Sequence, residues 1–353
     1  MLPESTALKI LHFMEPEEAH GWAIWALRNG MVPGSGPVTS PRLETEIAGL
    51  KLPNPLGLAA GFDKNAVALG GLAQSAFGFL EVGAATPEPQ SGNARPRVFR
   101  LKEDKGIINR FGFNNDGALA ISARLEQRPK GSIVGLNLGA NKNSEDRVQD
   151  YVAVLVSCAA HVDFVTVNVS SPNTEGLRDL QGRKALWALL TEVLDARGLI
   201  PERIPVFLKI APDLTDEELE DIADVAVTSS LDGLIATNTT RERKGLKSRH
   251  AKQEGGLSGA PLFDLSTQIQ AKLYRLTQGK LPIIGVGGVS TAAQAIEKIR
   301  AGATAVQLYS SMIYSGISVA KEIAEGMDRY ADEEGLKSIS DIRGETARSW
   351  AGF

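Results

Sequence analysis

The chain has 353 residues, of which 43% are hydrophobic and 23% are charged, and its formal net charge at pH 7 is −4. This composition excludes a disordered chain, and without a block of Lys and Arg the sequence does not favour nucleic-acid binding. The single cysteine, Cys158, excludes an intramolecular disulfide and a Cys-rich metal site. With no signal-peptide pattern at its start, the sequence favours a reducing, cytoplasmic compartment.

Two short helices are predicted in the first thirty residues. Ala7, Leu11 and Met14 recur at helical spacing, and Pro16 then begins a second amphipathic segment that ends before Gly30. No part of the sequence has the roughly 18 consecutive apolar residues of a transmembrane helix. We therefore expect a small helical hairpin over residues 1–32, followed by a turn-rich linker that reads MVPGSGP.

From about residue 43 the pattern changes to short apolar runs that alternate with longer segments of helical periodicity. The eight runs span residues 56–60, 79–83, 133–136, 164–167, 206–208, 233–236, 283–286 and 305–308. This alternation predicts a parallel sheet of β/α units, and eight repeats fit a closed (β/α)8 barrel, or TIM barrel, over residues 43–326. An open doubly wound sheet is the competing architecture, but no GxGxxG motif follows the first strand. Residues 327–353 are expected to form a polar C-terminal tail.

The connections between the predicted strands differ in how clearly they are marked. Thr215 with Glu218 predicts a capping box, and Ser290 is the predicted cap of a later helix that ends at Gly302. Two connections, residues 84–132 and 238–282, are much longer than a β/α loop requires. We expect these long connections to carry function or to cover a site.

Polar side chains follow the predicted strands, and in a barrel these positions meet at the C-terminal rim, where active sites are built. Amides dominate the set, which includes Asn109, Asn137, Asn168, Asn173 and Asn238. Because amides both donate and accept hydrogen bonds, the cluster suits a planar heterocycle, and two lysines, Lys64 and Lys209, add positive charge. No carboxylate pair or histidine spacing fits a metal, so we predict an organic anion or cofactor and no metal.

The last two strand ends resemble a phosphate cradle. Gly287 and Gly288 leave backbone N–H groups open to a ligand, and Tyr309 and Ser310 lead into a short helical segment whose N-terminus favours an anion. Barrels often bind phosphate after their seventh and eighth strands, which is where these residues are expected.

Taken together, these segments resemble the dihydroorotate dehydrogenases, and specifically the membrane-associated, quinone-dependent class 2. The resemblance covers residues 1 to about 325 and rests on the motifs AAGFDKN (59–65), ATPEPQSGNARPRVFRL (85–101), INRFGFNN (108–115), GLNLGANK (135–142), NVSSPNTEGLR (168–178), LKIAPDL (208–214), IATNTT (235–240), GGLSGAPL (255–262), IIGVGGV (283–289) and QLYSSMIY (307–314). It implies a barrel that oxidises (S)-dihydroorotate to orotate, with FMN as hydride acceptor, in de novo pyrimidine biosynthesis.

The resemblance also implies which residues hold each ligand. It implies FMN contacts from Ala60, Gly61, Lys64, Ala84, Asn137, Asn168, Lys209, Thr237, Gly259, Gly288, Tyr309 and Ser310. It implies pyrimidine contacts from Lys64, Asn109, Arg110, Phe111, Gly112, Phe113, Asn168, Asn173, Asn238 and Thr239. Ala84 stands where relatives usually carry Thr or Ser, so a hydroxyl contact to FMN would be missing there.

The same resemblance implies chemical roles. Ser171 matches the catalytic base of class 2, and Phe113 would close over the substrate. Because a serine hydroxyl is a weak base, it needs a further proton acceptor, for which Thr174 with water is our candidate. Lys209 would stabilise negative charge at flavin N1 and O2.

The catalytic base distinguishes the classes, because the resemblance gives a cysteine base to the soluble class 1 enzymes. The only cysteine here, Cys158, lies on a predicted helix before the fourth strand and is expected to be a small buried hydrophobe. His20, Arg100 and Tyr309 match positions that line a quinone tunnel in class 2. We therefore expect ubiquinone or menaquinone as the final electron acceptor.

The predicted hairpin would be the membrane-docking module. Residues 1–30 contain two basic and four acidic residues, so exposed apolar side chains, including Trp22 and Trp25, are expected to drive insertion. We predict a peripheral protein on the cytoplasmic face of a bacterial inner membrane that requires no protein partner. Two alternatives remain open: an enzyme of class 1 type that uses fumarate or a partner subunit, and a non-catalytic flavin- or phosphate-binding barrel.

Overall fold

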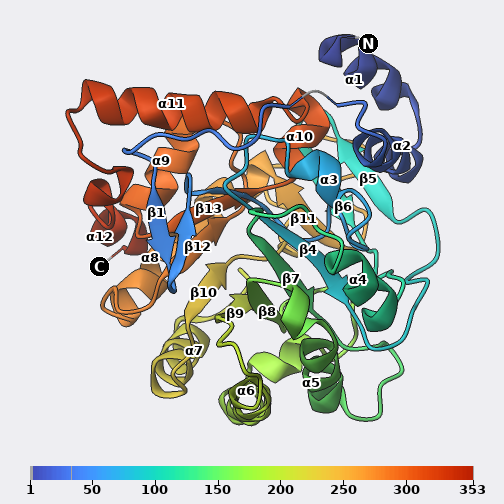
Figure 1. Cartoon of the computed structure of the whole chain (residues 1–353), viewed down its shortest axis with the longest axis vertical. Helices are drawn as coiled ribbons and strands as arrows, with labels where there is room; N and C mark the ends of the chain where they lie inside the picture. The colour runs from blue at the N-terminus through green and yellow to red at the C-terminus, as the bar shows by residue number, and fades with distance from the viewer. Residues whose placement is uncertain (1–2, 33, 353) are drawn as a thin grey trace.

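The computed structural model describes residues 3–32 and 34–352, and residues 1, 2 and 353 of the predicted hairpin and tail lie outside this range. Eight parallel strands close into a barrel in the order β3-β4-β7-β8-β9-β10-β12-β13, with β13 pairing back to β3 (Figure 1). The strands are β3 (Leu56–Leu58), β4 (Phe79–Ala85), β7 (Val134–Leu138), β8 (Phe164–Asn168), β9 (Val206–Ile210), β10 (Gly233–Ala236), β12 (Ile283–Val286) and β13 (Ala305–Leu308). Each coincides with one predicted apolar run, and the predicted barrel is confirmed.

Helices surround the barrel and follow its strands along the chain. They are α3 (Leu69–Leu72), α4 (Ala118–Leu125), α5 (Arg147–Cys158), α6 (Arg183–Gly198), α7 (Asp216–Thr228), α8 (Phe263–Leu276), α9 (Ala292–Arg300), α10 (Ser310–Ser315), α11 (Val319–Glu333) and α12 (Ala347–Ala351). The capping box of Thr215 and Glu218 is present at α7, as predicted. The cap of α9 is Thr291 rather than Ser290. Ser290 donates both its backbone N–H and its hydroxyl to the side-chain oxygen of Gln294, and the helix begins one residue later than predicted.

The two predicted N-terminal helices are α1 (Glu4–Phe13) and α2 (Pro16–Arg28), which lie together beside the barrel (Figure 1). Glu15 caps α2 by accepting hydrogen bonds from the backbone N–H groups of Glu17 and Glu18, at 2.9 and 3.0 Å. Arg100 holds the end of α1 by donating to the carbonyls of its last turn, among them Leu11 at 3.1 Å. Among the residues described, no helix combines the length and apolar character needed to cross a membrane.

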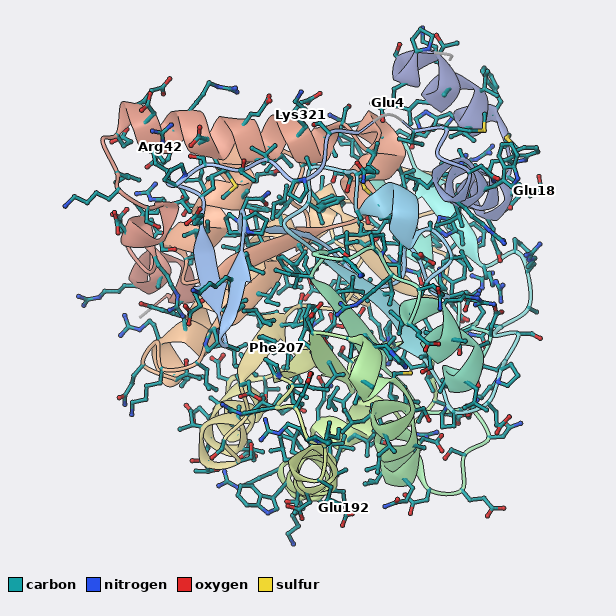
Figure 2. The ribbon with its side chains drawn as sticks, viewed as in Figure 1. Glu4, Glu18, Arg42, Glu192, Phe207 and Lys321 are labelled. Carbon is teal, nitrogen blue, oxygen red and sulfur yellow. The ribbon has the colours of Figure 1, made fainter. Side chains whose placement is uncertain are left out.

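The barrel interior is arranged in layers. The end of the barrel at which the strands begin is filled by the rings of Phe79, Phe164 and Phe207. Phe207 lies near the centre of the molecule in Figure 2. Phe164 meets both other rings edge-on, with centroids 6.2 and 5.6 Å away. Each ring fills the space over a glycine of a neighbouring strand, and a Cβ on Gly135 would lie 2.2 Å from the Phe164 ring. This aromatic layer fills the end of the barrel at which the strands begin.

Two small antiparallel sheets complete the fold. One pairs β1 (Thr45–Ile47) with β2 (Leu50–Leu52), and its Ile47 and Leu52 belong to the same buried cluster as the aromatic layer. The other has the order β11-β6-β5, with β5 (Val98–Leu101), β6 (Gly106–Asn109) and β11 (Gly256–Gly259). The second sheet is built from the two long connections predicted to carry function, and it places Arg100, Asn109 and Gly259 beside the rim.

The C-terminal region corrects one predicted boundary. Helix α11 continues across residues 326 and 327, so no division of the fold falls there. The following residues form the 3₁₀ turn η4 (Ile339–Ile342) and α12, and both isoleucines of η4 are buried. The indole of Trp350 donates to Glu297 Oε1 at 2.6 Å, which joins α12 to α9. The predicted polar tail is therefore packed against the barrel; its few apolar residues did not suffice to predict this.

Candidate active site

One cavity of about 1640 Å³ runs from the C-terminal mouth of the barrel to the helices of the hairpin. Every residue predicted to contact FMN lines it, as do the three predicted quinone-site residues. The predicted substrate and catalytic residues that line it are Lys64, Asn109, Phe111, Gly112, Phe113, Asn168, Ser171, Asn173, Asn238 and Thr239. The side chains of Arg110 and Thr174 are the two from these predictions that fall outside the lining.

Arg110 points away from the cavity. Its guanidinium donates to Gln253 Oε1, at 3.1 Å, and to the backbone carbonyls of Glu254 and Pro96, and it lies over the Phe99 ring. These contacts join the two long connections to each other. The Arg110 side chain therefore braces the loops above the rim, and its predicted contact with the substrate stays a prediction.

The predicted amides form a connected chain across the barrel mouth. Asn137 on β7 accepts from Asn168 Nδ2 at 2.7 Å, and Asn168 Oδ1 accepts from Ser170 Oγ at 2.8 Å. Asn238 in turn donates to Ser170 Oγ at 3.0 Å. Because each amide has a partner that fixes its orientation, the donors and acceptors facing the cavity are set before any ligand arrives.

Ser171 lies in the loop after β8, with 5% of its surface exposed, and its Oγ accepts from the backbone N–H of Asn173 at 3.3 Å. The Asn173 side chain reaches Asn109 of β6, with 3.5 Å between Nδ2 and Oδ1. The loop after β8 and the antiparallel sheet thus face the same space. Thr174 is also buried, but no hydrogen bond joins it to Ser171 within residues 3–32 and 34–352.

Lys64 provides positive charge at the cavity wall. Its ammonium donates to the carbonyl of Gly61 at 2.6 Å and lies 4.1 Å from the centre of the Phe111 ring. Burial lowers the pKa of Lys64 to about 8, against the charge of Glu17, which raises it. The lysine is therefore charged at neutral pH and loses its charge in mildly alkaline solution.

The loop that carries Phe113 is held in a fixed shape above the rim. Phe113 has a φ of 54°, in the left-handed region, and its ring lies where a Cβ on Gly139 would be 3.2 Å away. Gln90 donates to the backbone carbonyls of Gly112 and Phe113, each at 3.1 Å, and Asn115 donates to that of Phe113 at 2.8 Å. Three side-chain hydrogen bonds thus stabilise a backbone conformation that a bulky residue rarely adopts.

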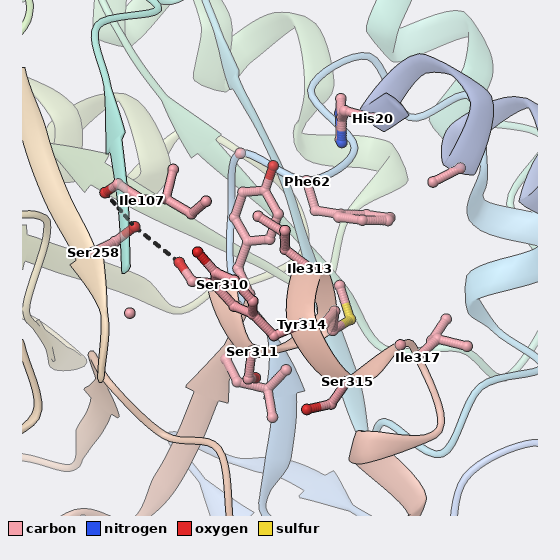
Figure 3. Close-up of a pocket in the computed structure, with 18 of the residues that line it drawn as sticks. His20, Phe62, Ile107, Ser258, Ser310, Ser311, Ile313, Tyr314, Ser315 and Ile317 are labelled. Carbon is pink, nitrogen blue, oxygen red and sulfur yellow. Dashed lines mark hydrogen bonds between the residues drawn. The ribbon is translucent and has the colours of Figure 1, made fainter. Parts of the chain in front are cut away.

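The opposite side of the barrel mouth contains the predicted phosphate cradle. Gly287 and Gly288 line the cavity with φ angles of 122° and 75°, and neither could carry a Cβ without meeting α8. Ser310 donates to Ser258 Oγ at 2.8 Å, a bond drawn in Figure 3. The Ser311 hydroxyl next to it is buried and has no hydrogen-bond partner in the described part of the chain.

The hairpin end of the cavity is aromatic and apolar. His20 of α2 meets the Phe62 ring edge-on, with 5.3 Å between ring centres, and Phe62 meets Tyr309 at 5.5 Å. Figure 3 draws His20 next to Phe62. Burial is the main cause that lowers the pKa of His20 to about 3, and the charge of Lys64 adds to it. Burial also raises the pKa of Tyr309. Both rings are therefore uncharged at neutral pH, which suits a lipid-soluble ligand.

An ion pair joins the hairpin to the loops above the rim. Glu17 of α2 accepts from Arg97 at 2.7 Å and from Arg95 at 3.0 Å, and the Arg97 side chain is almost fully buried. Burial raises the pKa of Glu17, but the hydrogen bonds and charges of the two arginines outweigh this, so the pKa is lowered. Arg97 also lies 5.4 Å from the Phe111 ring, so two residues, Arg97 and Phe111, connect the hairpin to Lys64.

Sequence reasoning missed the polar residues inside the strands. Glu81 of β4 and Gln307 of β13 are completely buried in the barrel interior, where Glu81 accepts from Gln307 and Asn137 at 2.7 Å each. The signal was a charged or amide side chain inside an apolar run, in FLEVGAA and AVQL. Arg97 was missed as well, since a buried arginine in a long loop has no local signature.

The fold and the position of this cavity define a (β/α)8-barrel enzyme with its site at the C-terminal rim. A comparison with family models matches residues 42–330 to "Dihydroorotate dehydrogenase". The chain belongs to the dihydroorotate dehydrogenase family.

Curated relatives and solved structures agree with this assignment. A "Dihydroorotate dehydrogenase (quinone)" of Cereibacter sphaeroides is 59% identical over 348 residues, which cover 98% of both chains. One of the same name from Agrobacterium fabrum is 52% identical over 352 residues, covering 98% of this chain and 97% of that one. A ligand-free DHODH from Eimeria tenella superposes with a TM-score of 0.91 at 40% identity, covering 94% of this chain and 99% of that one. The predicted family and its quinone-dependent class are confirmed.

Proposed function

We propose that this chain oxidises (S)-dihydroorotate to orotate, with FMN as hydride acceptor and a membrane quinone, ubiquinone or menaquinone, as final electron acceptor. The observation that carries the proposal is the single continuous cavity, which joins the amide-lined barrel mouth to an aromatic opening between the hairpin helices. A polar substrate and an apolar acceptor can therefore reach one buried cofactor from different sides. The family and the quinone-dependent names of its relatives support the same reaction.

Dihydroorotate dehydrogenases are flavin-dependent, and the residues at the barrel end of the cavity fit FMN. A flavin mononucleotide needs a cradle for its phosphate and polar partners for its ring, and the cavity offers the two glycines after β12 for the first. The Ser311 hydroxyl next to these glycines lacks a partner among the described residues, and for the ring the cavity offers Lys209 and the equally unpartnered Gln307 Oε1. These three polar side chains and the glycines would hold the cofactor.

The amides would hold the pyrimidine ring. Asn109, Asn173 and Asn238 come from three different segments and all line the cavity next to Ser171. The charged form of Lys64 would attract the substrate carboxylate, and Phe113 would exclude water above the ring. A substrate fixed by several directional hydrogen bonds reacts faster, because its orientation no longer has to be found in each encounter.

The reaction removes a proton from C5 and a hydride from C6 of the substrate. Ser171 Oγ would take the proton, and we retain Thr174, three residues further along the loop, to pass it on through water. When bound, FMN would supply the acceptor for the hydride and the electrons that reduce the quinone. His20 and Tyr309 would line the path of the quinone as uncharged rings. Arg100 would fix the position of α1 beside that path, because it donates to the carbonyls of Leu11 and Met14 at the end of the helix.

We further propose that the hairpin docks this chain on the cytoplasmic face of a bacterial inner membrane, as a peripheral protein that needs no protein partner. Large apolar side chains of α1, α2 and the following turn are exposed to solvent, namely Ile10, Phe13, Trp22, Trp25 and Met31. An apolar surface of this size beside the opening of the cavity would bring the quinone path to the lipid.

The first half-reaction can be tested without oxygen. Purified protein loaded with FMN should lose its flavin absorbance when dihydroorotate is added, and Ser171→Ala should slow this by about a hundredfold or more without releasing FMN. Ser157→Ala is the matched control, because that hydroxyl bonds only within α5, to the carbonyl of Ala153. Bleaching of Ser171→Ala at the normal rate would refute the base, and a wild-type protein that does not bleach would refute the activity.

A further inference from the structure

The barrel interior contains a buried carboxylate that none of the steps above uses. Glu81 lies on β4 above the aromatic layer of Phe79, Phe164 and Phe207, and none of its surface is exposed. An ionised side chain is strongly disfavoured in such a place unless other groups compensate its charge. Its presence at the base of the cofactor cavity therefore calls for a partner.

Glu81 is fixed in place by two amides. Gln307 Nε2 and Asn137 Nδ2 donate to its two oxygens, each at 2.7 Å, from strands on opposite sides of β4 along the barrel. Both oxygens thus accept hydrogen bonds, which is the pattern of an ionised carboxylate. Because its nearest polar neighbours are amides, which carry no charge, they orient the carboxylate without neutralising it.

Lys209 carries the opposite charge across the barrel. It lies on β9, is 5% exposed, and lines the cavity. Desolvation lowers its pKa, and the charge of Glu81 opposes this. No ion pair within 4.0 Å links the two groups within the described residues, so Glu81 acts on Lys209 through space. Because no hydrogen bond from the ammonium to another group is formed within residues 3–32 and 34–352 either, its N–H groups can serve a ligand.

The other charged groups around the cavity do not compensate the buried positive charge of Lys209. Lys64 lines the same cavity, but the charges that act on it are those of Glu17, Arg97 and Asp63. In the strand register, Lys209 is flanked by Asn168 of β8 and Ile235 of β10, neither of which carries a charge. Glu81 is hydrogen-bonded to Asn137, Asn137 is hydrogen-bonded to Asn168, and Asn168 lies beside Lys209, so one row of amides connects the carboxylate to the lysine.

We propose that Glu81 is a positioning residue of the cofactor site, a clamped counter-charge that keeps Lys209 protonated without occupying its hydrogen bonds. The inference rests on the proposed function, because it concerns the lysine that would face FMN. A direct Glu–Lys ion pair would hold the ammonium back from the cofactor, whereas a carboxylate held by two amides supports its charge from a distance. The sequence places this carboxylate inside an otherwise apolar strand.

The test is the pH dependence of the flavin midpoint potential, measured on full-length holoenzyme. A plot of potential against pH changes slope where a nearby group loses its proton. In the wild type we expect a slope change due to Lys209, which Lys209→Met should abolish. Glu81→Gln should move it to lower pH by about one unit, a tenfold weaker proton affinity. The double variant Glu81→Gln/Lys209→Met should match Lys209→Met.

Thr166→Val is the matched control. Thr166 is a buried residue of the neighbouring strand β8 whose hydroxyl has no partner in the described part of the chain, so the change alters the same interior without altering charge. It should leave the slope change where it is. A slope change that does not move in Glu81→Gln, or a shift of potential that persists when Lys209 is already Met, would overturn the proposal.

A second measurement covers the case in which Glu81→Gln folds poorly. If its defect arises from an uncompensated Lys209, thermal unfolding of the FMN-free protein should show that adding Lys209→Met restores the melting temperature. A double variant as unstable as the single one would overturn the proposal, since Glu81 would then act only through its amide contacts. Failure of the wild type to oxidise dihydroorotate would refute the proposed function but leave both of these readouts intact.

Discussion

Replacing Phe13 with serine should release much of this protein from lipid vesicles. Phe13 ends α1 and has 93% of its surface exposed, more than any other large apolar side chain described. Burying an aromatic side chain removes about 150–250 Å² from water, and at about 25 cal/mol per Å² full insertion would contribute about 4–6 kcal/mol. If the ring inserts to half that extent, the loss is about 2–3 kcal/mol, and the partition coefficient of Phe13→Ser should be roughly 30- to 150-fold lower.

Flotation with vesicles measures this effect directly, and the chain offers a matched control. Leu199, 88% exposed, directly follows α6, and this helix lies at the opposite end of the molecule from α1 (Figure 1). Leu199→Ser should bind vesicles like the wild type. Because the hairpin carries more acidic than basic residues, phosphatidylcholine vesicles should bind about as well as vesicles that contain phosphatidylglycerol. Equal binding of Phe13→Ser and wild type, or binding that requires anionic lipid, would refute an apolar docking surface.

Further predictions concern charge and packing. Because the pKa of Lys64 is about 8, its ammonium is charged below that pH and neutral above it, so kcat/KM for dihydroorotate should fall as the pH rises through about 8; a flat profile would contradict this. Phe207→Ala should lower the free energy of unfolding in urea by about 3–5 kcal/mol, whereas Val227→Ala on the surface of α7 should change it by less than about 0.5 kcal/mol. Glu17→Gln should destabilise the hairpin by about 2 kcal/mol, visible as faster proteolysis of α2, because buried Arg97 would lose its charged partner; unchanged proteolysis would count against the ion pair.

The sequence predicted the barrel well because its signals are periodic and repeated. Each barrel strand is a short apolar run followed by polar rim residues, and this pattern does not depend on side-chain detail. The two N-terminal helices were equally clear, since Pro16 and the following glutamates mark where α2 begins. The cap of α9 was displaced by one residue, because which of two adjacent hydroxyl groups caps a helix depends on a side chain, Gln294, one turn away.

Other features depend on the direction of single side chains, which no local pattern encodes. Arg110 lies within a predicted substrate motif, yet its guanidinium points to the long connection after β10. Glu81 resembles a surface residue in the sequence, and only closure of the barrel reveals that it is enclosed. In the C-terminal region, a few buried residues such as Ile339 and Ile342 anchor a segment that is otherwise polar. Each of these requires contacts between residues far apart in the chain.

The most direct test of the account is the fate of the electrons after the first half-reaction. Protein loaded with FMN is bleached with dihydroorotate in the absence of oxygen and then mixed with ubiquinone, menaquinone or fumarate. We expect a quinone to restore the flavin absorbance rapidly, fumarate to leave it bleached, and removal of residues 1–30 to abolish the quinone reaction while FMN and dihydroorotate still bind. Restoration by fumarate, or by quinone in the truncated protein at the full rate, would contradict a quinone-dependent enzyme whose hairpin forms the entry path.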